Sequence, residues 1–556
     1  MKRKHQRDFE QTIDGIIDGS CPHVKSIYCH VAPGGGKSII PIIAGRLIEA
    51  GLADKLIWIA PRLSLVDQAE REFINPYFRK LLGHRLEIRS STNEYNPCRG
   101  IHGFATTYNA VGMDVNILFN EFERRRYILV CDEFHHIQEN SLWHKKIAPL
   151  FNMAAYRVML SGTLERGDGT RIAFMPYKMN GGGLTPDLRD TEEVKVIRYT
   201  REDALREKAI LPLVFHLHDG QVNWQSKTGR DVRVSSMDRM ESYDASKAIY
   251  TALHTEFAEE LLRAGLKHWL TCREKNPGAK CLIVCSDIVQ AKKHAANLKK
   301  WGFTGYEIAT SDDSAKALSA IKKLKSGELR ILVAVAMIYE GMNVPSATHV
   351  ISLTRVRSTP WIEQMTARVN RIDPQAGPYE DQQGYVFAPA DPLFKEIVSR
   401  IEAEQAAVLV SESNGKGKNG KPATAKNGEF SLQASPGGII PLSSKLTDQR
   451  EIVLGGGLAD SDEEMPLLTS TEREADILGQ IEDHIRRYSF QNRYNPKKIN
   501  AEVFDYFGKR RREMTLSELQ ACLAYVRSAY PMSFIRGTGH RRVSTKAQPV
   551  AMRWAR

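Results

Sequence analysis

The sequence has no long hydrophobic run. No stretch approaches the roughly 18 consecutive apolar residues that mark a membrane-spanning helix, so no transmembrane segment is expected. The first residues, MKRKHQRDFEQ, also lack the apolar core of a secretory signal. These absences predict a cytoplasmic protein that has no membrane partner.

Cysteine is scarce as well. The chain has 8 cysteines in 556 residues, and no two of them form a C-x-x-C pair. Several lie inside apolar, strand-like runs, which favours reduced core residues over disulfides or a zinc site. The positions are Cys21, Cys29, Cys98, Cys131, Cys272, Cys281, Cys285 and Cys522.

The composition is otherwise that of a globular protein, with 42% hydrophobic and 26% charged residues. A chain of 556 residues should form about three to four domains. The formal net charge of +12 favours a polyanionic partner, and nucleic acid before a membrane surface. A protein that is merely basic, with no such partner, is the alternative.

A glycine-rich segment, Val31 to Ser38 (VAPGGGKS), follows an apolar run and precedes an apolar helical pattern. Strand, glycine-rich turn and helix form the context of a phosphate-binding loop, because backbone N–H groups and a helix N-terminus attract an anion. Lys37 would reach the β- and γ-phosphates, and the Ser38 hydroxyl would ligate magnesium. The motif G-x-x-x-x-G-K-[ST] begins with glycine, whereas this chain has Val31 there.

Strand-like and helix-like segments alternate through residues 1–200, which predicts a parallel sheet covered on both faces. Ligands bind at the carboxyl ends of such strands. Asp132 and Glu133 directly follow an apolar strand at 127–131. An acidic pair alone is commonly a solvated turn. Together with Lys37 it suits a nucleotide site, in which Asp132 would hold magnesium and Glu133 would orient and deprotonate the attacking water.

After a bridge and surface hairpin at 201–244, a second α/β unit is expected at 245–400, without a phosphate loop of its own. Two such units suggest a nucleotide clamped in the cleft between them. The second unit should supply cationic groups, and the candidates in QMTARVNR are Gln364, Arg368 and Arg371. These three would share one face if the segment is helical. An ordinary basic helix face is the alternative.

Taken in order, these segments resemble the motifs of superfamily 2 helicases of the DExH type. The resemblance covers about residues 1–395, and its motifs stand at 3–6 (RKHQ), 31–38, 60–62 with Gln68, 105–108, 132–136 (DEFHH), 161–163 (SGT), 340–345 (EGMNVP) and 364–371. The pattern is similar to the branch of restriction-enzyme translocating subunits and phage or bacterial DNA-remodelling helicases. This implies two tandem RecA-like lobes with a cleft between them, ATP and Mg²⁺ as cofactors, and the cytoplasm of a bacterium or phage-infected cell.

The resemblance also implies roles for individual residues. Catalytic roles fall on Lys37, Glu133, Gln364, Arg368 and Arg371, with Arg371 as the arginine finger. Nucleotide contacts fall on Gln6, Pro33, Gly34, Gly35, Gly36, Lys37, Ser38, Gly341 and Asn343. The metal ligands would be Ser38 and Asp132. Coupling of hydrolysis to strand movement falls on His135, Ser161 and Thr163. Nucleic-acid contacts fall on Pro61, Arg62 and Thr107.

Two positions depart from the family pattern. Asn343 stands where aspartate is usual, which keeps an acceptor but loses a charge, so a ribose or coupling contact is expected to be weaker. Ala367 stands where glycine is usual. Neither position touches the triphosphate, so an active ATPase is still expected.

The tail divides into two parts. Residues 411–465, rich in Gly, Lys, Asn and Ser in their first half, predict a flexible linker. Helical patterning resumes in 466–556, with Thr515 as the expected N-cap of the last helix. From residue 465 onward the chain has 17 Lys and Arg against 9 Asp and Glu. A small basic helical module of this kind fits DNA docking, and a module that binds a protein partner fits equally well.

The leading functional expectation is an ATP-dependent DNA helicase or translocase, which couples Mg-ATP hydrolysis to movement on or remodelling of DNA. An RNA-dependent ATPase or helicase is an alternative that the motifs do not separate. A DNA-binding recruitment factor that uses ATP as a switch is another, although Asp132, Glu133 and Arg371 argue for turnover. A restriction-system motor subunit also fits, but no nuclease or methylase motif is visible.

Overall fold

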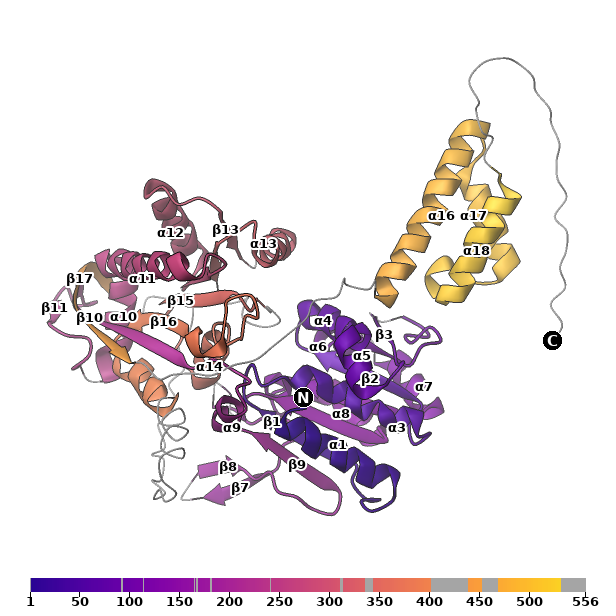
Figure 1. The fold of residues 1–556 in the computed structure, drawn as a ribbon, viewed down its shortest axis with the longest axis horizontal. Coiled ribbons are helices and arrows are strands. Elements are labelled where there is room, and N and C mark those ends of the chain that lie inside the picture. The colour runs from indigo at the N-terminus through magenta and orange to yellow at the C-terminus, as the bar shows by residue number, and fades with distance from the viewer. Residues whose placement is uncertain are drawn as a thin grey trace.

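The computed structural model of the chain describes residues 2–531 apart from 92–93, 114, 165, 167–168, 181–182, 241, 311–313, 336–343, 402–438 and 453–468. Two α/β lobes lie side by side, and a helical module projects from the first lobe (Figure 1). Among the described residues, no helix is both long enough and apolar enough to cross a membrane.

The first lobe contains a seven-stranded sheet in the order β3-β4-β2-β5-β6-β1-β9, in which every pair of neighbours is parallel. Its strands are β1 (Ser26–Val31), β2 (Lys55–Ala60), β3 (Ile88–Ser90), β4 (Gly103–Thr107), β5 (Tyr127–Asp132), β6 (Tyr156–Ser161) and β9 (Val194–Tyr199). Its helices are α1 (Lys4–Ile17), η1 (Lys37–Ile39), α2 (Ile40–Ala44), α3 (Arg46–Glu49), α4 (Leu63–Ile74), α5 (Pro76–Leu82), α6 (Tyr108–Met113), α7 (Asn116–Arg124), η2 (Phe134–His136), α8 (Leu142–Met153) and α9 (Arg201–Arg206). A small antiparallel hairpin of β7 (Tyr177–Asn180) and β8 (Gly183–Pro186) follows β6.

Both faces of this sheet are buried, because successive residues of its apolar strands point to opposite sides. In β2, for example, Leu56 and Trp58 belong to the apolar cluster that includes residues of α1, α2 and α4, while Ile57 and Ile59 belong to the cluster that includes residues of α6, α7 and α8. The parallel sheet expected for residues 1–200 is therefore confirmed. The helical pattern after the phosphate loop is broken into η1, α2 and α3.

The second lobe contains an eight-stranded sheet in the order β11-β10-β16-β15-β12-β14-β13, with β17 paired to β10. Its strands are β10 (Leu213–Gln225), β11 (Asp231–Val234), β12 (Lys280–Cys285), β13 (Tyr306–Ala309), β14 (Ile331–Val335), β15 (Ala347–Leu353), β16 (Gly384–Pro389) and β17 (Ile440–Ile452). Its helices are α10 (Ser242–His254), α11 (Glu256–Lys275), α12 (Ile288–Lys300), α13 (Ser314–Ser326), α14 (Thr359–Thr366) and η4 (Tyr379–Asp381). Strands β10, β16, β15, β12, β14 and β13 run parallel, whereas β11 and β17 are antiparallel to β10.

Two expected boundaries are wrong. Residues 213–225, assigned to the bridge at 201–244, form β10, a full member of the second sheet. Residues 440–452, assigned to the linker at 411–465, form β17, which pairs along nearly all of β10. Strand β17 forms because it pairs with β10. The polar composition of residues 443–449 does not indicate a strand.

The C-terminal module is a three-helix unit of α16 (Ser470–Asn492), α17 (Pro496–Phe507) and α18 (Leu516–Ala529), with η6 (Arg511–Glu513) before the last helix. It has its own apolar core, in which Ile481, Ile485 and Val526 are buried. The Thr515 hydroxyl accepts from the backbone N–H of Glu518, so the expected N-cap is confirmed.

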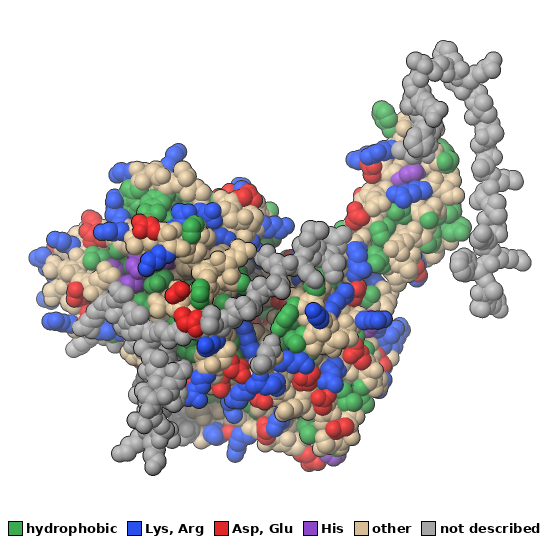
Figure 2. Space-filling model, viewed as in Figure 1, with side chains coloured by type: hydrophobic (Ala, Val, Ile, Leu, Met, Phe, Trp, Pro, Cys, Tyr) green, Lys and Arg blue, Asp and Glu red, His purple; other side chains and the backbone are tan. Residues whose placement is uncertain are grey.

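The described part of the module is nearly neutral. Residues 469–531 contain 11 Lys and Arg and 9 Asp and Glu, so most of the basic excess counted from the sequence belongs to residues 532–556, outside the described part. Blue Lys and Arg atoms and red Asp and Glu atoms are interspersed over the visible face of the molecule (Figure 2). The helices of the module are therefore not the strongly basic surface that the sequence predicts.

The module contacts the first lobe through the start of α16 and through η6, where the Arg512 carbonyl accepts from Arg99. Glu474, which is 7% exposed, accepts from Arg89 at 3.1 and 3.3 Å and from Arg99 at 2.7 Å. Glu94 of the first lobe pairs with the same two arginines at 2.6 Å. The interface thus has a buried network of two carboxylates and two guanidinium groups at its centre.

Candidate functional site

The phosphate loop lies at the carboxyl end of β1, and its glycines are required by the backbone. Gly34 and Gly36 have φ of +85° and +82°, in the left-handed region that favours glycine. A Cβ atom at Gly34 would lie 2.9 Å from the Asn370 side chain, and one at Gly36 would lie 2.7 Å from Arg3. The loop is therefore packed between Arg3, near the N-terminus, and Asn370 of the second lobe.

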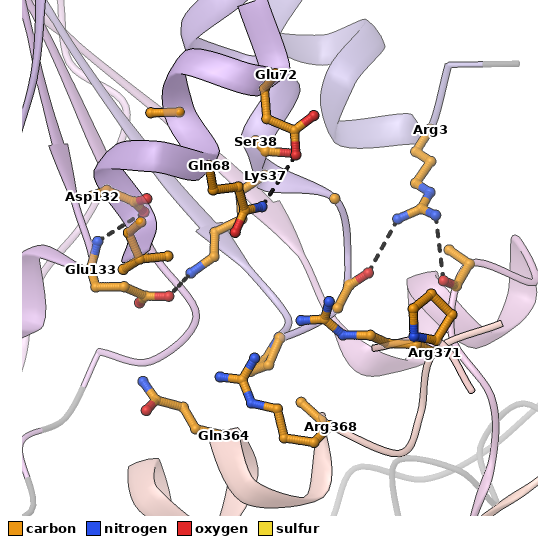
Figure 3. A pocket seen from close by; sticks show the side chains of 18 of the residues that line it. Arg3, Lys37, Ser38, Gln68, Glu72, Asp132, Glu133, Gln364, Arg368 and Arg371 are labelled. Atoms are coloured by element: carbon orange, nitrogen blue, oxygen red, sulfur yellow. Dashed lines mark hydrogen bonds and ion pairs between the residues drawn. The ribbon is translucent and has the colours of Figure 1, made fainter. Parts of the chain in front are cut away.

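Three polar side chains meet beyond this loop (Figure 3). The Lys37 ammonium forms an ion pair with Glu133 Oε1, and both side chains are largely buried. Asp132 accepts from the Trp58 indole N–H at 3.3 Å and from the Glu133 backbone N–H at 3.0 Å. Because β5 lies beside β2 and β6 in the sheet, its carboxyl end brings this acidic pair opposite the phosphate loop.

The two carboxyl groups differ in acidity. Burial, together with the neighbouring Glu133, raises the pKa of Asp132 to about 6, against the opposing effect of Lys37. Burial also acts to raise the pKa of Glu133, but Lys37 and His135 outweigh it and leave that pKa lowered. Glu133 therefore carries the charge that pairs with Lys37. Its backbone has φ +49°, a left-handed conformation that is strained for this residue type and common at functional sites.

A polar chain connects Glu133 to the end of β6. His135 Nδ1 lies 3.4 Å from Glu133 Oε2 and 2.9 Å from Ser161 Oγ. The Ser161 hydroxyl in turn bonds to the backbone N–H and C=O of Thr163. The three residues expected to couple hydrolysis to movement are thus in contact with one another and with the acidic pair.

The second lobe contributes the opposite wall. Gln364, Arg368 and Arg371 line the same cavity of about 370 Å³ as Lys37 and Glu133. Helix α14 ends at Thr366, so the expectation that these three share one helix face is wrong, and the two arginines follow the helix in a turn. Asn370 contacts the phosphate loop, because its side-chain amide lies 3.5 Å from the Pro33 carbonyl oxygen.

Burial and the nearby Arg368 lower the pKa of Arg371 to about 9, although Glu72 acts in the other direction. The acidic groups around this guanidinium therefore do not offset its burial. A site of this kind is built to receive a further anion.

Each of the two lobes that form this cavity matches a known sequence family. Residues 3–166 match the family described as type III restriction enzyme, res subunit, and residues 259–373 match the helicase conserved C-terminal domain. The first match covers most of the lobe with the phosphate loop, and the second covers the lobe with the two arginines. The chain belongs to the superfamily 2 helicases.

Individual relatives are distant. The uncharacterized protein Rv2917 of Mycobacterium tuberculosis is 25% identical over 382 residues, which are 68% of this chain and 60% of that protein. The helicase Lhr of Mycobacterium smegmatis, solved with ssDNA and AMP-PNP, has a TM-score of 0.44 and 14% identity, over 74% of this chain and 51% of that one. Dbp5 of S. cerevisiae, solved with RNA and ADP BeF3, has a TM-score of 0.39 and 11% identity, over 68% and 83%. The chain thus spans about three fifths of the length of its mycobacterial relative.

Among the lining side chains that have a polar group, four were not predicted to line the cavity: Arg3, Trp58, Gln68 and Glu72. Glu72 accepts from Gln68 at 3.2 Å, and burial raises its pKa. Gln68 and Glu72 lie four residues apart on α4, so helical spacing together with the end of β2 was the available signal. Arg3 belongs to the motif at 3–6, but the position of its side chain depends on hydrogen bonds to the Gly34 and Ala209 carbonyl oxygens, which the motif does not reveal.

Gln6 does not reach the cavity in the expected way. Its amide donates to the Gly36 carbonyl at 3.1 Å and its side-chain oxygen accepts from the Arg3 backbone N–H at 2.9 Å, which places it behind the phosphate loop. Arg3 faces the cavity instead (Figure 3). Gly341 and Asn343, the remaining expected nucleotide contacts, lie outside the described residues.

The expected nucleic-acid contacts lie together at one edge of the first sheet. Pro61 and Arg62 follow β2, and Thr107 ends β4, directly beside Ala60 in the parallel register. The Thr107 hydroxyl accepts from the Ala110 backbone N–H at 3.1 Å and so caps α6. This hydrogen bond gives Thr107 a local structural role in addition to the expected one.

The residues present fit a magnesium-bound triphosphate. The loop from Gly34 to Gly36 has no side chains that would block approach of an anion, and Lys37 and Arg371 supply positive charge on two sides. Asp132 and Ser38 provide the carboxylate and hydroxyl oxygens that Mg²⁺ prefers.

Proposed function

We propose that the protein is an ATP-dependent helicase or translocase that acts on nucleic acid, and on DNA rather than RNA. The observation that supports this most directly is the cavity between the lobes, where Lys37, Asp132 and Glu133 of one lobe face Gln364, Arg368 and Arg371 of the other. A site divided between two lobes changes when the lobes move, which is how hydrolysis can drive motion along a strand.

In the proposed mechanism, Lys37 leaves Glu133 to bind the β- and γ-phosphates. Lys37 lowers the pKa of Glu133, so the carboxylate becomes a stronger base once Lys37 leaves, and it then orients the attacking water and accepts its proton. Arg368 and Arg371 approach from the second lobe and stabilise the charge that develops on the transferred phosphoryl group. An arginine in this role contributes about 10³–10⁵ to the rate.

Asp132 and Ser38 would hold Mg²⁺, which neutralises phosphate charge when bound. The Trp58 indole fixes one Asp132 oxygen and the Glu133 backbone N–H fixes the other, so the carboxylate is oriented before the ion arrives. Orientation of this kind by surrounding hydrogen bonds strengthens metal binding.

Coupling to strand movement would pass through His135 and Ser161. When Glu133 changes partner, His135 loses or gains its contact at 3.4 Å, and Ser161 transmits the change to the turn at Thr163. The edge formed by Pro61, Arg62 and Thr107 would hold the strand. The preference for DNA is supported by the match to the restriction-enzyme family. The net charge of +12 favours nucleic acid of either kind.

The test is ATP turnover by the full chain with single-stranded DNA, duplex DNA or RNA at one fixed salt concentration. We expect DNA to raise turnover more than RNA, and we expect Lys37→Ala to abolish stimulated turnover while the far-UV spectrum stays unchanged. Lys55→Ala is the matched control, since this partly buried lysine of the same lobe bonds to Ile101 at the amino end of β2 and is remote from the cavity.

Each other outcome has a distinct meaning. Turnover by Lys37→Ala equal to that of the wild type would refute the mechanism. Greater stimulation by RNA would assign the motor to RNA. Turnover that no nucleic acid raises would favour a recruitment factor in which ATP acts as a switch.

A further inference from the structure

A cluster of metal-binding side chains lies in the second lobe, away from the nucleotide cavity. Its members are His268 and Cys272 on α11 and His349 on β15, and we refer to them as the His/Cys cluster. His268 and Cys272 are four residues apart, so they project from the same face of the helix. Helix α11 packs across β15, which brings that face onto His349.

The three ligand atoms converge. His268 Nδ1 lies 2.9 Å from His349 Nε2 and 3.7 Å from Cys272 Sγ, and all three atoms lie within 4.8 Å of one another. In a tetrahedral zinc site, bonds of about 2.0–2.1 Å to nitrogen and about 2.3 Å to sulfur give N–N and N–S separations of about 3.4 and 3.6 Å. Of the two separations, the one between His268 and Cys272 already matches this geometry, and the cluster reaches it if the two imidazoles move slightly apart and Cys272 Sγ lies within bonding range of the same ion.

The second nitrogen of His349 is held in the manner typical of metal-binding histidines. Its Nδ1 lies 2.8 Å from the Thr348 hydroxyl oxygen. With Nδ1–H as the donor, Nε2 presents its lone pair to His268 and Cys272. An oxygen that fixes the tautomer of a ligating imidazole from behind is the usual outer contact of a zinc site.

The surroundings of the His/Cys cluster leave a path for an ion and hold the imidazole rings in place. His349 is fully buried, whereas His268 and Cys272 are half-buried, so the cluster has one side toward solvent through which an ion can enter. The His216 ring lies 4.7 Å from the His268 ring and stacks on Phe387 at 4.3 Å, which fixes the imidazoles laterally.

We propose that His268, Cys272 and His349 form a zinc site, with water as the fourth ligand, that ties α11 to the second sheet. Two imidazoles and a thiolate suit Zn²⁺ and exclude Mg²⁺, which takes oxygen ligands. His349 lies four residues before Leu353, the last residue of β15, or about 13 Å along the strand, so this ion is separate from the nucleotide chemistry. For Cys272 this proposal departs from the expectation from sequence, which favoured reduced core cysteines over a zinc site.

The role of the ion would be structural. Helix α11 covers β15 and β16, and the His216 ring beside the cluster is bonded to Gln449 of β17 at 3.1 Å. Holding α11 against β15 therefore stabilises the part of the sheet on which β10 and β17 pair. A ligand that binds only the folded lobe raises its stability by mass action.

The experiment uses the full chain, freed of metal by a chelator and then dialysed. Titration with Co²⁺ is expected to produce thiolate-to-cobalt charge-transfer absorption and the visible bands of a tetrahedral ion at one equivalent, and Zn²⁺ is expected to displace it. Zn²⁺, but not Mg²⁺ alone, should raise the melting temperature. Cys272→Ser should lose the thiolate absorption and bind Zn²⁺ at least tenfold more weakly.

Cys21→Ser is the matched control, because Cys21 is a half-buried free cysteine of the first lobe. It should keep both the absorption and the affinity. His268→Gln tests the same site at a half-buried position, where loss of folding is not expected. Absence of thiolate absorption in the wild type, or equal Zn²⁺ affinity of the Cys272→Ser and Cys21→Ser chains, would overturn the proposal.

Discussion

The contact between the C-terminal module and the first lobe depends on one carboxylate. Glu474 lies between Arg89 and Arg99, and the three side chains are 5–7% exposed. Removing one partner from a buried ion pair costs about 3–5 kcal/mol, because the remaining charge stays buried without compensation. Glu94 still pairs with both arginines, so the lower end of that range applies to Glu474→Ala.

A loss of about 3 kcal/mol lowers the ratio of docked to undocked module about 100-fold. The two other ion pairs of the interface are more exposed, with Arg71 paired to Glu472 at 2.6 Å and Arg473 to Glu87 at 2.5 Å. Exposed pairs of this kind contribute about 0–1 kcal/mol each. They do not replace the buried network, so the variant should release the module while both units stay folded.

Hydrogen exchange measured by mass spectrometry reports this release at a single position. The Thr471 backbone N–H donates to Glu70 of the first lobe at 2.7 Å, and in the Glu474→Ala chain it should exchange as an exposed helix terminus does. Small-angle scattering should show a larger radius of gyration. Glu482→Ala, an exposed position on the same helix, is the matched control. Protection of Thr471 equal to that of the wild type would refute the reasoning.

Two further predictions concern other charged groups. In the second lobe, Arg357 donates to Asp391 at 2.9 Å with both side chains 0–1% exposed, so Asp391→Ala should destabilise that lobe by about 3–5 kcal/mol, measured by denaturant unfolding; a change below about 1 kcal/mol would contradict this. Burial acts to raise the pKa of Glu87, but Arg473 and Arg79 outweigh it and leave that pKa lowered. The Glu87 carboxylate therefore stabilises docking fully at a pH above the ordinary glutamate pKa near about 4.3. It ceases to do so as the pH falls through the lowered pKa. Protonation of Glu87 should weaken docking by about 0–1 kcal/mol, so scattering between pH 7 and 3 should show a larger released fraction only at the acid end, and an increase above pH 5 would contradict the assignment.

The parts of the site that were predictable are those carried by local sequence. Val31 to Ser38 and the pair Asp132 and Glu133 each follow an apolar strand, and parallel strands present their carboxyl ends at one edge of the sheet. That rule alone was enough to expect these groups near one another. The same rule predicted that Pro61 and Thr107 lie near one another, and the register of β2 and β4 brings them together.

The predictions that were wrong concern residues whose positions depend on partners remote in sequence. A helical face was expected for Arg368 and Arg371, but α14 ends at Thr366, and Asn370 turns toward Pro33 of the other lobe. Strand β17 forms because β10 offers an edge for pairing, not because of its own composition. Spacing within a segment does not report such contacts.

The sequence by itself determined that the chain forms two parallel α/β units and that one of them binds phosphate, because strand periodicity and a glycine loop act over a few residues. Only the tertiary structure decided which charges meet. Glu474 reaches Arg89 across 385 residues, and His268 and Cys272 reach His349 across about eighty. Side chains that far apart in sequence are placed by the packing of a helix on a sheet, and no local pattern encodes that distance.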